Sequence, residues 1–185
     1  MRTIRLSSMM RALAVCVGAL AFAGAGFAAG DKAAYESAKA SAKSTYEAAK
    51  ARCDALTGNA KDICVAEAKA ARTRTEVDAE AAYKDTPKAR QHAVEEKAEA
   101  GYKVDKERCD DRTGNDKDVC VKVAKAALVK AKADAKVTRV STDARIDASK
   151  DKREADYKVA AEKCGAIAGD ARSACIAQAK AKYGM

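Results

Sequence analysis

Six of the seven cysteines fall into three regular pairs, and they are the residues whose spacing points most directly to chemistry. Each pair has ten residues between its two members: Cys53 and Cys64, Cys109 and Cys120, and Cys164 and Cys175. A glycine followed by Asn or Asp marks each midpoint: Gly58-Asn59, Gly114-Asn115 and Gly169-Asp170. Residues equidistant from the turn of an antiparallel hairpin face each other, so this symmetry predicts a disulfide within each pair. It is one of fifteen pairings that six cysteines allow.

Redox catalysis and zinc binding are the alternative roles for these cysteines. A redox-active pair is usually Cys-x-x-Cys on a mixed α/β scaffold, and zinc needs about four converging ligands. The segments between the paired cysteines contain no histidine. The single histidine, His92, has no counterpart in the other copies of the motif, so we expect a solvated or partly packed helix residue. The sequence predicts no metal site and no cofactor.

Long helices are the elements expected to position these turns, because the chain has one Pro, no Trp and two Phe among many Ala and Lys residues. Glycine accepts the left-handed conformation that ends a helix. Thr86 before Pro87, and Ser141 or Thr142 before Asp143, are signatures of a helix start. Together these signals predict six helices, at 31–56, 60–85, 87–112, 116–140, 143–167 and 170–183. The expected fold is all-α, with three tandem disulfide-clasped antiparallel helical hairpins in an elongated or coiled-coil-like arrangement.

A tyrosine accompanies every cysteine pair and shows that the motif belongs to a longer repeat. Tyr46, Tyr102 and Tyr157 each lie seven residues before the first cysteine, and the repeats are offset by 56 and 55 residues. We therefore divide the chain into hairpin repeats at 29–86, 87–141 and 142–185, the last with a truncated second arm. The tyrosines are expected to pack between arms; an aromatic platform for a ligand is the alternative.

The fourth predicted helix carries an apolar stripe with alternating four- and three-residue steps, as in a coiled coil. Its members are Val119, Val123, Ala126, Lys130, Ala133, Val137 and Val140, of which Lys130 is the one charged interruption. Such a stripe favours a protein partner or self-association along the helix seams.

The N-terminal residues have the three parts of a secretory signal peptide: three arginines, an apolar run over 12–22 and a tail of small residues. We predict a signal peptide at 1–28 with cleavage after Ala28; Ala25 and Ala23 are alternative sites, and a retained membrane anchor is the alternative role. Cleavage would remove Cys16 and change the net charge from +9 to +6. The even number of remaining cysteines suits the periplasm or another oxidising, extracellular location.

The sequence gives no sign of an enzyme, because it has no nucleophile–base pair, phosphate-binding loop or metal motif. The carboxylates lie near Lys and Arg at helical spacings, as in solvated ion pairs. The Lys and Arg residues suggest an anionic envelope polymer as an alternative partner. Interleaved acids and sparse aromatics argue against nucleic acid.

The motif Cys-Asp-x-x-Thr-Gly-Asn-x-Lys-Asp-x-Cys-Val, with the later run 155–164, resembles exported Ala/Lys-rich cysteine-repeat proteins of proteobacteria. Some of these are labelled TolA-like or cell-envelope proteins. The Tyr-Glu-x-Ala-Lys pattern at Tyr35 and Tyr46 is also similar to that of desiccation-protectant late-embryogenesis proteins. The resemblance implies a non-enzymatic helical protein of the Gram-negative envelope, with a structural or stress-related role.

Overall fold

The computed structural model describes residues 30–185, and every regular element in that range is helical. In chain order the elements are α1 (Lys32–Cys53), α2 (Gly58–Lys84), α3 (Pro87–Cys109), α4 (Gly114–Lys163), the short 3₁₀ helix η1 (Cys164–Ala166) and α5 (Gly169–Tyr183). The all-α class therefore agrees with the sequence-based prediction. The predicted six helices are wrong, since one helix of 50 residues, α4, replaces the fourth and fifth.

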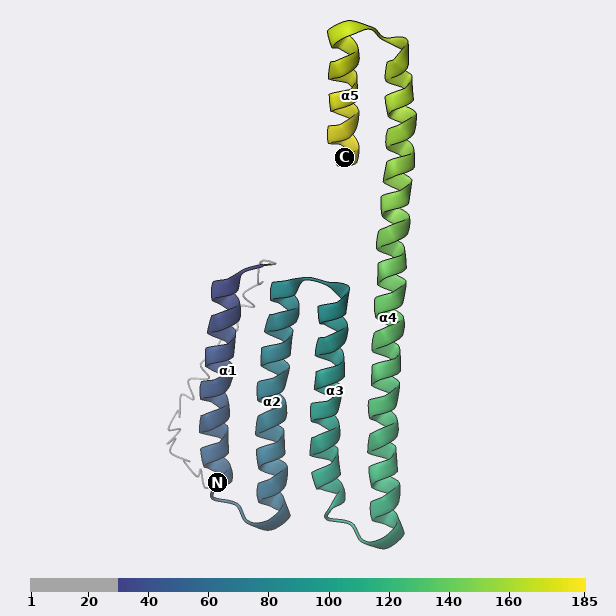
Figure 1. Ribbon diagram of the computed structural model, residues 1–185. Helices are drawn as coiled ribbons and strands as arrows, with labels where there is room; N and C mark the ends of the chain where they lie inside the picture. Colours follow the sequence, from purple (N-terminus) through teal and green to yellow (C-terminus); the bar gives the residue numbers. More distant parts are fainter. Residues whose placement is uncertain (1–29) are drawn as a thin grey trace, which may run out of the picture.

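The helices form a single layer in which each packs against its neighbours in the sequence. Contacts join α1 to α2, α2 to α3, α3 to α4 and α4 to α5. Figure 1 shows α1, α2, α3 and the first part of α4 side by side, with α4 continuing far beyond them and α5 folding back along its distant end. At about 1.5 Å per residue, α4 alone is roughly 75 Å long. In the described range, no second layer covers either face.

The three cysteine turns have the same backbone conformation. The residue before each glycine is extended, and Gly58, Gly114 and Gly169 have φ values of 57°, 53° and 62°. Residues with a Cβ rarely adopt this left-handed conformation, so glycine is needed there. The sequence places these turns correctly because the conformational requirement belongs to one residue type.

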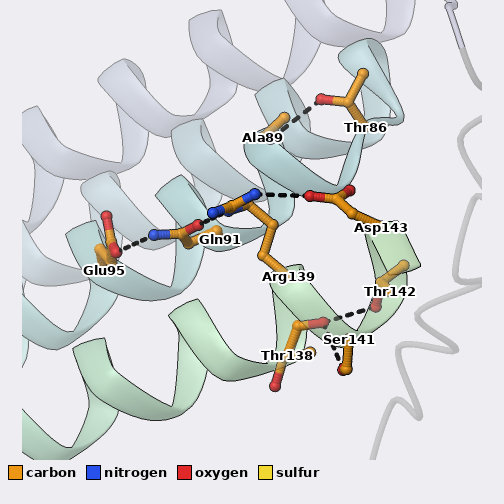
Figure 2. Close-up of polar contacts among 9 residues, drawn as sticks. All are labelled: Thr86, Ala89, Gln91, Glu95, Thr138, Arg139, Ser141, Thr142 and Asp143. Atoms are coloured by element: carbon orange, nitrogen blue, oxygen red, sulfur yellow. Dashed lines mark hydrogen bonds and ion pairs between the residues drawn. The ribbon is translucent and has the colours of Figure 1, made fainter. Parts of the chain in front are cut away.

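The turn between α2 and α3 contains a left-handed residue, an extended residue and a proline in succession. Asp85 ends α2 in the left-handed conformation at φ 44°, and Thr86 is extended. The Thr86 hydroxyl accepts a hydrogen bond from the Ala89 amide at 3.1 Å (Figure 2). Proline excludes a helical conformation from the residue before it and has no amide to donate within a helix. The predicted helix start at Thr86 and Pro87 is therefore present.

The predicted helix start at Ser141, Thr142 and Asp143 is absent, because α4 runs through it without a break. The Ser141 and Thr142 hydroxyls donate to the Thr138 carbonyl at 3.0 and 2.8 Å instead of capping a new helix (Figure 2). Asp143 accepts a hydrogen bond from Arg139 at 2.6 Å, one turn earlier on the same helix. These contacts are compatible with a continuous helix, and no proline prevents it. The boundary predicted at 141/142 between two repeats thus lies inside α4.

Buried residues lie along the seams between adjacent helices, and most are alanines. Two clusters join α2 to α3: Ala70, Ala100 and Val104 form one, and Val77, Ala81 and Ala93 form the other. Alanine buries little area, so each seam allows close approach but adds little hydrophobic stabilisation. The largest fully buried side chains are Cys53, Cys109 and Cys164.

The predicted signal peptide at 1–28 lies outside the described residues. Within 30–185, none of the helices has the length and apolar character required to cross a membrane.

Candidate interaction surface

The paired cysteines are joined as disulfides within the turns: Cys53–Cys64, Cys109–Cys120 and Cys164–Cys175. These are the pairs that the turn symmetry predicts. Their Cα atoms lie 5.6, 5.7 and 5.8 Å apart, within the usual range for this bond. A disulfide-bonded cysteine has no thiolate to attack a substrate or bind zinc. The paired cysteines therefore act in this state as covalent ties between consecutive helices.

An ion pair closes each of the first two turns beside its disulfide. Lys61 lies 3.0 Å from Asp54, and Lys117 lies 2.8 Å from Asp110. The hydrogen bond from the lysine lowers the pKa of each aspartate below its ordinary value. The third turn has Gly165 in place of the aspartate, so it has no equivalent of this pair.

Asn59 joins the first turn to the second instead of capping α2. Its side-chain amide donates to the Glu107 carbonyl at 3.0 Å and to the Asp111 carboxylate at 2.6 Å. The contact spans 48 and 52 residues, a separation over which a local motif carries no signal.

The repeated tyrosines lie half-buried in the helices that carry them. Arg72 of α2 lies over the Tyr46 ring at 5.5 Å, and Lys125 of α4 lies over the Tyr102 ring at 5.2 Å. Each of these two rings therefore contacts a cation of the opposite arm. No cation covers the ring of Tyr157 among the described residues.

Two further tyrosines, whose contact no sequence pattern indicates, join the open end of the first two helices. The rings of Tyr35 and Tyr83 stack with centroids 5.2 Å apart and planes 11° from parallel. The repeat places Gln91 and Arg139 at the equivalent positions, where the Arg139 guanidinium donates to the Gln91 amide oxygen (Figure 2). A ring stack joins α1 to α2, and a hydrogen bond joins α3 to α4 at the equivalent place. Because the residue types differ, aligning the repeats does not indicate that these positions are in contact.

The apolar stripe predicted on the fourth helix lies on the open side of α4. All seven of its residues are exposed, with Val119 at 51%, Val123 at 65%, Val137 at 68% and Val140 at 50%. The face of α4 that packs against α3 instead carries Ala124, Leu128 and Ala135. At 100° per residue, the two sets lie on nearly opposite sides of the helix. We refer to the seven exposed residues of the first set as the valine stripe. They are Val119, Val123, Ala126, Lys130, Ala133, Val137 and Val140.

Charged side chains surround a cavity of about 600 Å³ on one face of α1, α2 and α3. Its cations are Lys61, Lys69, Arg72 and Lys103, and acids lie among them. Arg72 is 2.7 Å from Glu76, while Lys69 and Lys103 make no ion pair among the described residues. The cavity thus has two lysines available for an anion.

The groups in the described part of the chain that could hold a metal ion include the single histidine. His92 is exposed on α3, and no cluster of three or more His, Cys, Asp or Glu residues at 30–185 has the geometry to hold a metal ion. The valine stripe carries four valines that are each at least half exposed. Comparison with protein-family models, with characterised proteins and with solved structures finds no match to this chain.

Proposed function

We propose that this protein is a non-enzymatic interaction module of the periplasm, structural or stress-related, that binds a protein partner along α4. The observation that carries the proposal is the valine stripe, whose four valines are each at least half exposed. Exposed apolar side chains grouped on one side of a helix typically mark an interaction site. The partner would gain the burial of these side chains on a helix that is already ordered, so little conformational entropy opposes binding.

The disulfides support an extracytoplasmic site of action. They tie the ends of α1 and α2, of α3 and α4, and of α4 and α5. Such bonds persist in oxidising compartments, and they stabilise a layer whose alanine seams bury little apolar area. The resemblance to exported cysteine-repeat proteins supports the same location.

Site-specific photocrosslinking tests the proposal in Gram-negative cells that produce the protein. A photoreactive phenylalanine analogue replaces Val123 in one variant and Lys136 in a matched control. Lys136 is exposed on the same helix but lies about 100° away from Val137 around the axis. We expect a discrete cross-linked product from position 123, stronger under heat or osmotic stress, and none from position 136. No product at position 123, or equal products at both positions, would reject the proposal.

Binding of an anionic envelope polymer is the second candidate function. The observation that favours it is the pair Lys69 and Lys103, which face the 600 Å³ cavity without an ion-pair partner in the described range. Lipopolysaccharide binding measured at low and high salt tests this function. The double substitution Lys69→Ala and Lys103→Ala should abolish salt-sensitive binding. The control pair Lys150→Ala and Lys180→Ala, on distant exposed positions, should not.

A further inference from the structure

The contact between α2 and α3 shows how these two segments of the repeat pack, and it can be compared with the equivalent segments elsewhere in the chain. On α2 the contact uses Ala70, Val77 and Ala81, and on α3 it uses Ala93, Ala100 and Val104. All six side chains are at most 9% exposed. An ion pair between Asp78 of α2 and Lys97 of α3, at 2.5 Å, flanks these clusters.

The repeat places a second copy of this interface within the single helix α4. The offset of 56 residues carries the α2 side of the contact to the first half of α4, and the offset of 55 carries the α3 side to its second half. The first half then presents Ala126, Ala133 and Val137, and the second half presents Ala148, Ala155 and Val159. Val77 and Ala81 become Ala133 and Val137, which exchanges one Val and one Ala and conserves volume.

The flanking charges are also repeated. Asp78 corresponds to Asp134, and Lys97 corresponds to Lys152. Neither Asp134 nor Lys152 makes an ion pair within residues 30–185. The second half of α4 thus keeps the alanines, the valine and the lysine that α3 uses against α2.

Both halves of this second interface are exposed. Val137 is 68% and Val159 is 57% exposed, and the four alanines are exposed as well. The two halves follow each other along one straight helix, so Ala133 and Ala148 are separated by roughly 22 Å of axial rise. They cannot touch in one chain while α4 is unbroken at Ser141 and Thr142.

We propose that a second copy of this chain completes the interface, with the two α4 helices antiparallel and crossing near Thr142. The first half of each α4 then packs on the second half of the other, so the contact forms twice around a two-fold axis. Asp134 of one copy faces Lys152 of the other, as Asp78 faces Lys97 within the chain. This inference rests on the proposed function and names its partner as a second copy of the same protein.

Sedimentation equilibrium of the purified protein, with its three disulfides intact, tests the association. We expect a reversible dimer. Ala148→Glu should raise its dissociation constant by at least about tenfold, because a carboxylate would be buried against the first half of the other α4. Ser149→Glu is the matched control, since Ser149 is exposed about 100° away on the same helix, and it should leave the constant unchanged within about twofold.

Charge reversal identifies the register of the two helices. Asp134→Lys alone and Lys152→Asp alone should each weaken the dimer by about fivefold, because each places like charges together twice. The double variant restores opposite charges and should return the dissociation constant to within about twofold of the original protein. Additive weakening in the double variant would reject the proposed register.

Cysteine cross-linking separates the two-copy arrangement from a folded-back chain. In the variant Ala133→Cys with Ala148→Cys, oxidation should link position 133 of one copy to position 148 of the other and double the mass. A monomer at all concentrations up to about 100 μM, or a link within one chain, would overturn the inference. The photocrosslinking at position 123 would then still decide the proposed function, since a different protein partner gives a product of another mass.

Discussion

The junction between the first two repeats and the junction between the last two have aligned sequences but opposite structures. Thr86 and Pro87 begin a new helix after Asp85, whereas the aligned Ser141 and Thr142 lie within α4. The hydroxyl residues at both sites are competent caps, yet only Thr86 caps a helix. A capping residue therefore permits a helix start, whereas a proline disfavours continuation of the preceding helix.

This single difference changes the shape of the whole molecule. The turn at Pro87 returns the chain beside α2 and buries two apolar clusters. The continuous helix at Thr142 carries the third repeat away from the layer and leaves the equivalent residues of both halves of α4 exposed (Figure 1). The contact buried between α2 and α3 therefore has no counterpart between the two halves of α4.

The substitution Thr142→Pro should have the largest effect, because it gives the second junction the residue that bends the first. Proline inside α4 would remove a helical hydrogen bond and clash with the preceding turn, at a cost of about 3 kcal/mol or more for a straight helix. We expect α4 to break near Ser141 and the third repeat to fold back onto the valine stripe. Small-angle X-ray scattering should show a clear decrease in the maximum dimension. Thr142→Ala, which keeps the amide, should not.

The converse substitution tests whether the turn at Pro87 depends on proline alone. Pro87→Thr should lower the free energy of unfolding by about 0.4–1 kcal/mol through the greater freedom of the unfolded chain. It should leave the scattering profile unchanged, because the α2–α3 clusters and the pair of Asp78 with Lys97 still hold the turn. A longer particle for Pro87→Thr, or an unchanged one for Thr142→Pro, would contradict this account of the junctions.

The next effect compares disulfides in the compact and the extended regions. Removal of either Cys109–Cys120 or Cys164–Cys175 by serine pairs should lower stability by about 2–3 kcal/mol. The consequences should differ, because α5 packs only against α4 and η1, whereas α3 also packs against α2. Hydrogen exchange should show α5 losing protection locally in the Cys164→Ser, Cys175→Ser variant, with α1 to α3 unchanged.

The Cys109→Ser, Cys120→Ser variant should instead raise exchange throughout the layer, with a lower urea midpoint. Equal exchange profiles for the two variants would show that α5 unfolds together with the layer, against this prediction.

Local signals in the sequence predict the tied turns well. The turn between paired cysteines needs a residue in the left-handed conformation, and Gly58, Gly114 and Gly169 all supply it. The disulfide pairs follow from symmetry about those glycines. The direction of the chain at Thr142 was not predictable in the same way, because Ser141 and Thr142 can cap a helix or bond back to Thr138 within one.

The packed face of α4 also escaped prediction, for a reason that lies in composition. An alanine-rich helix has apolar residues on several sides, so both the valine stripe and the set Ala124, Leu128 and Ala135 satisfy helical periodicity. The pattern therefore predicts a stripe for a partner without showing which side of the helix packs against α3. Only the position of α3, fixed by the disulfide between Cys109 and Cys120, decides which side is buried.

The smallest effect concerns the ion pairs beside the disulfides, which the first two turns have and the third lacks. The hydrogen bond and charge of Lys117 keep the pKa of Asp110 below its ordinary value of 3.8. Because the folded-state pKa is the lower one, this pair stabilises the fold above the unfolded-state pKa, and the stabilisation is lost as pH falls through the folded-state value. Lys117→Ala should therefore raise the pKa of Asp110 and reduce the acid sensitivity of stability below about pH 4. Carboxyl NMR titration measures the first change.

Arg172→Ala at the equivalent position of the third turn, where Gly165 replaces the aspartate, should leave the Asp110 titration unchanged, and a shift there would show that the aspartate responds to net charge instead of to its own turn.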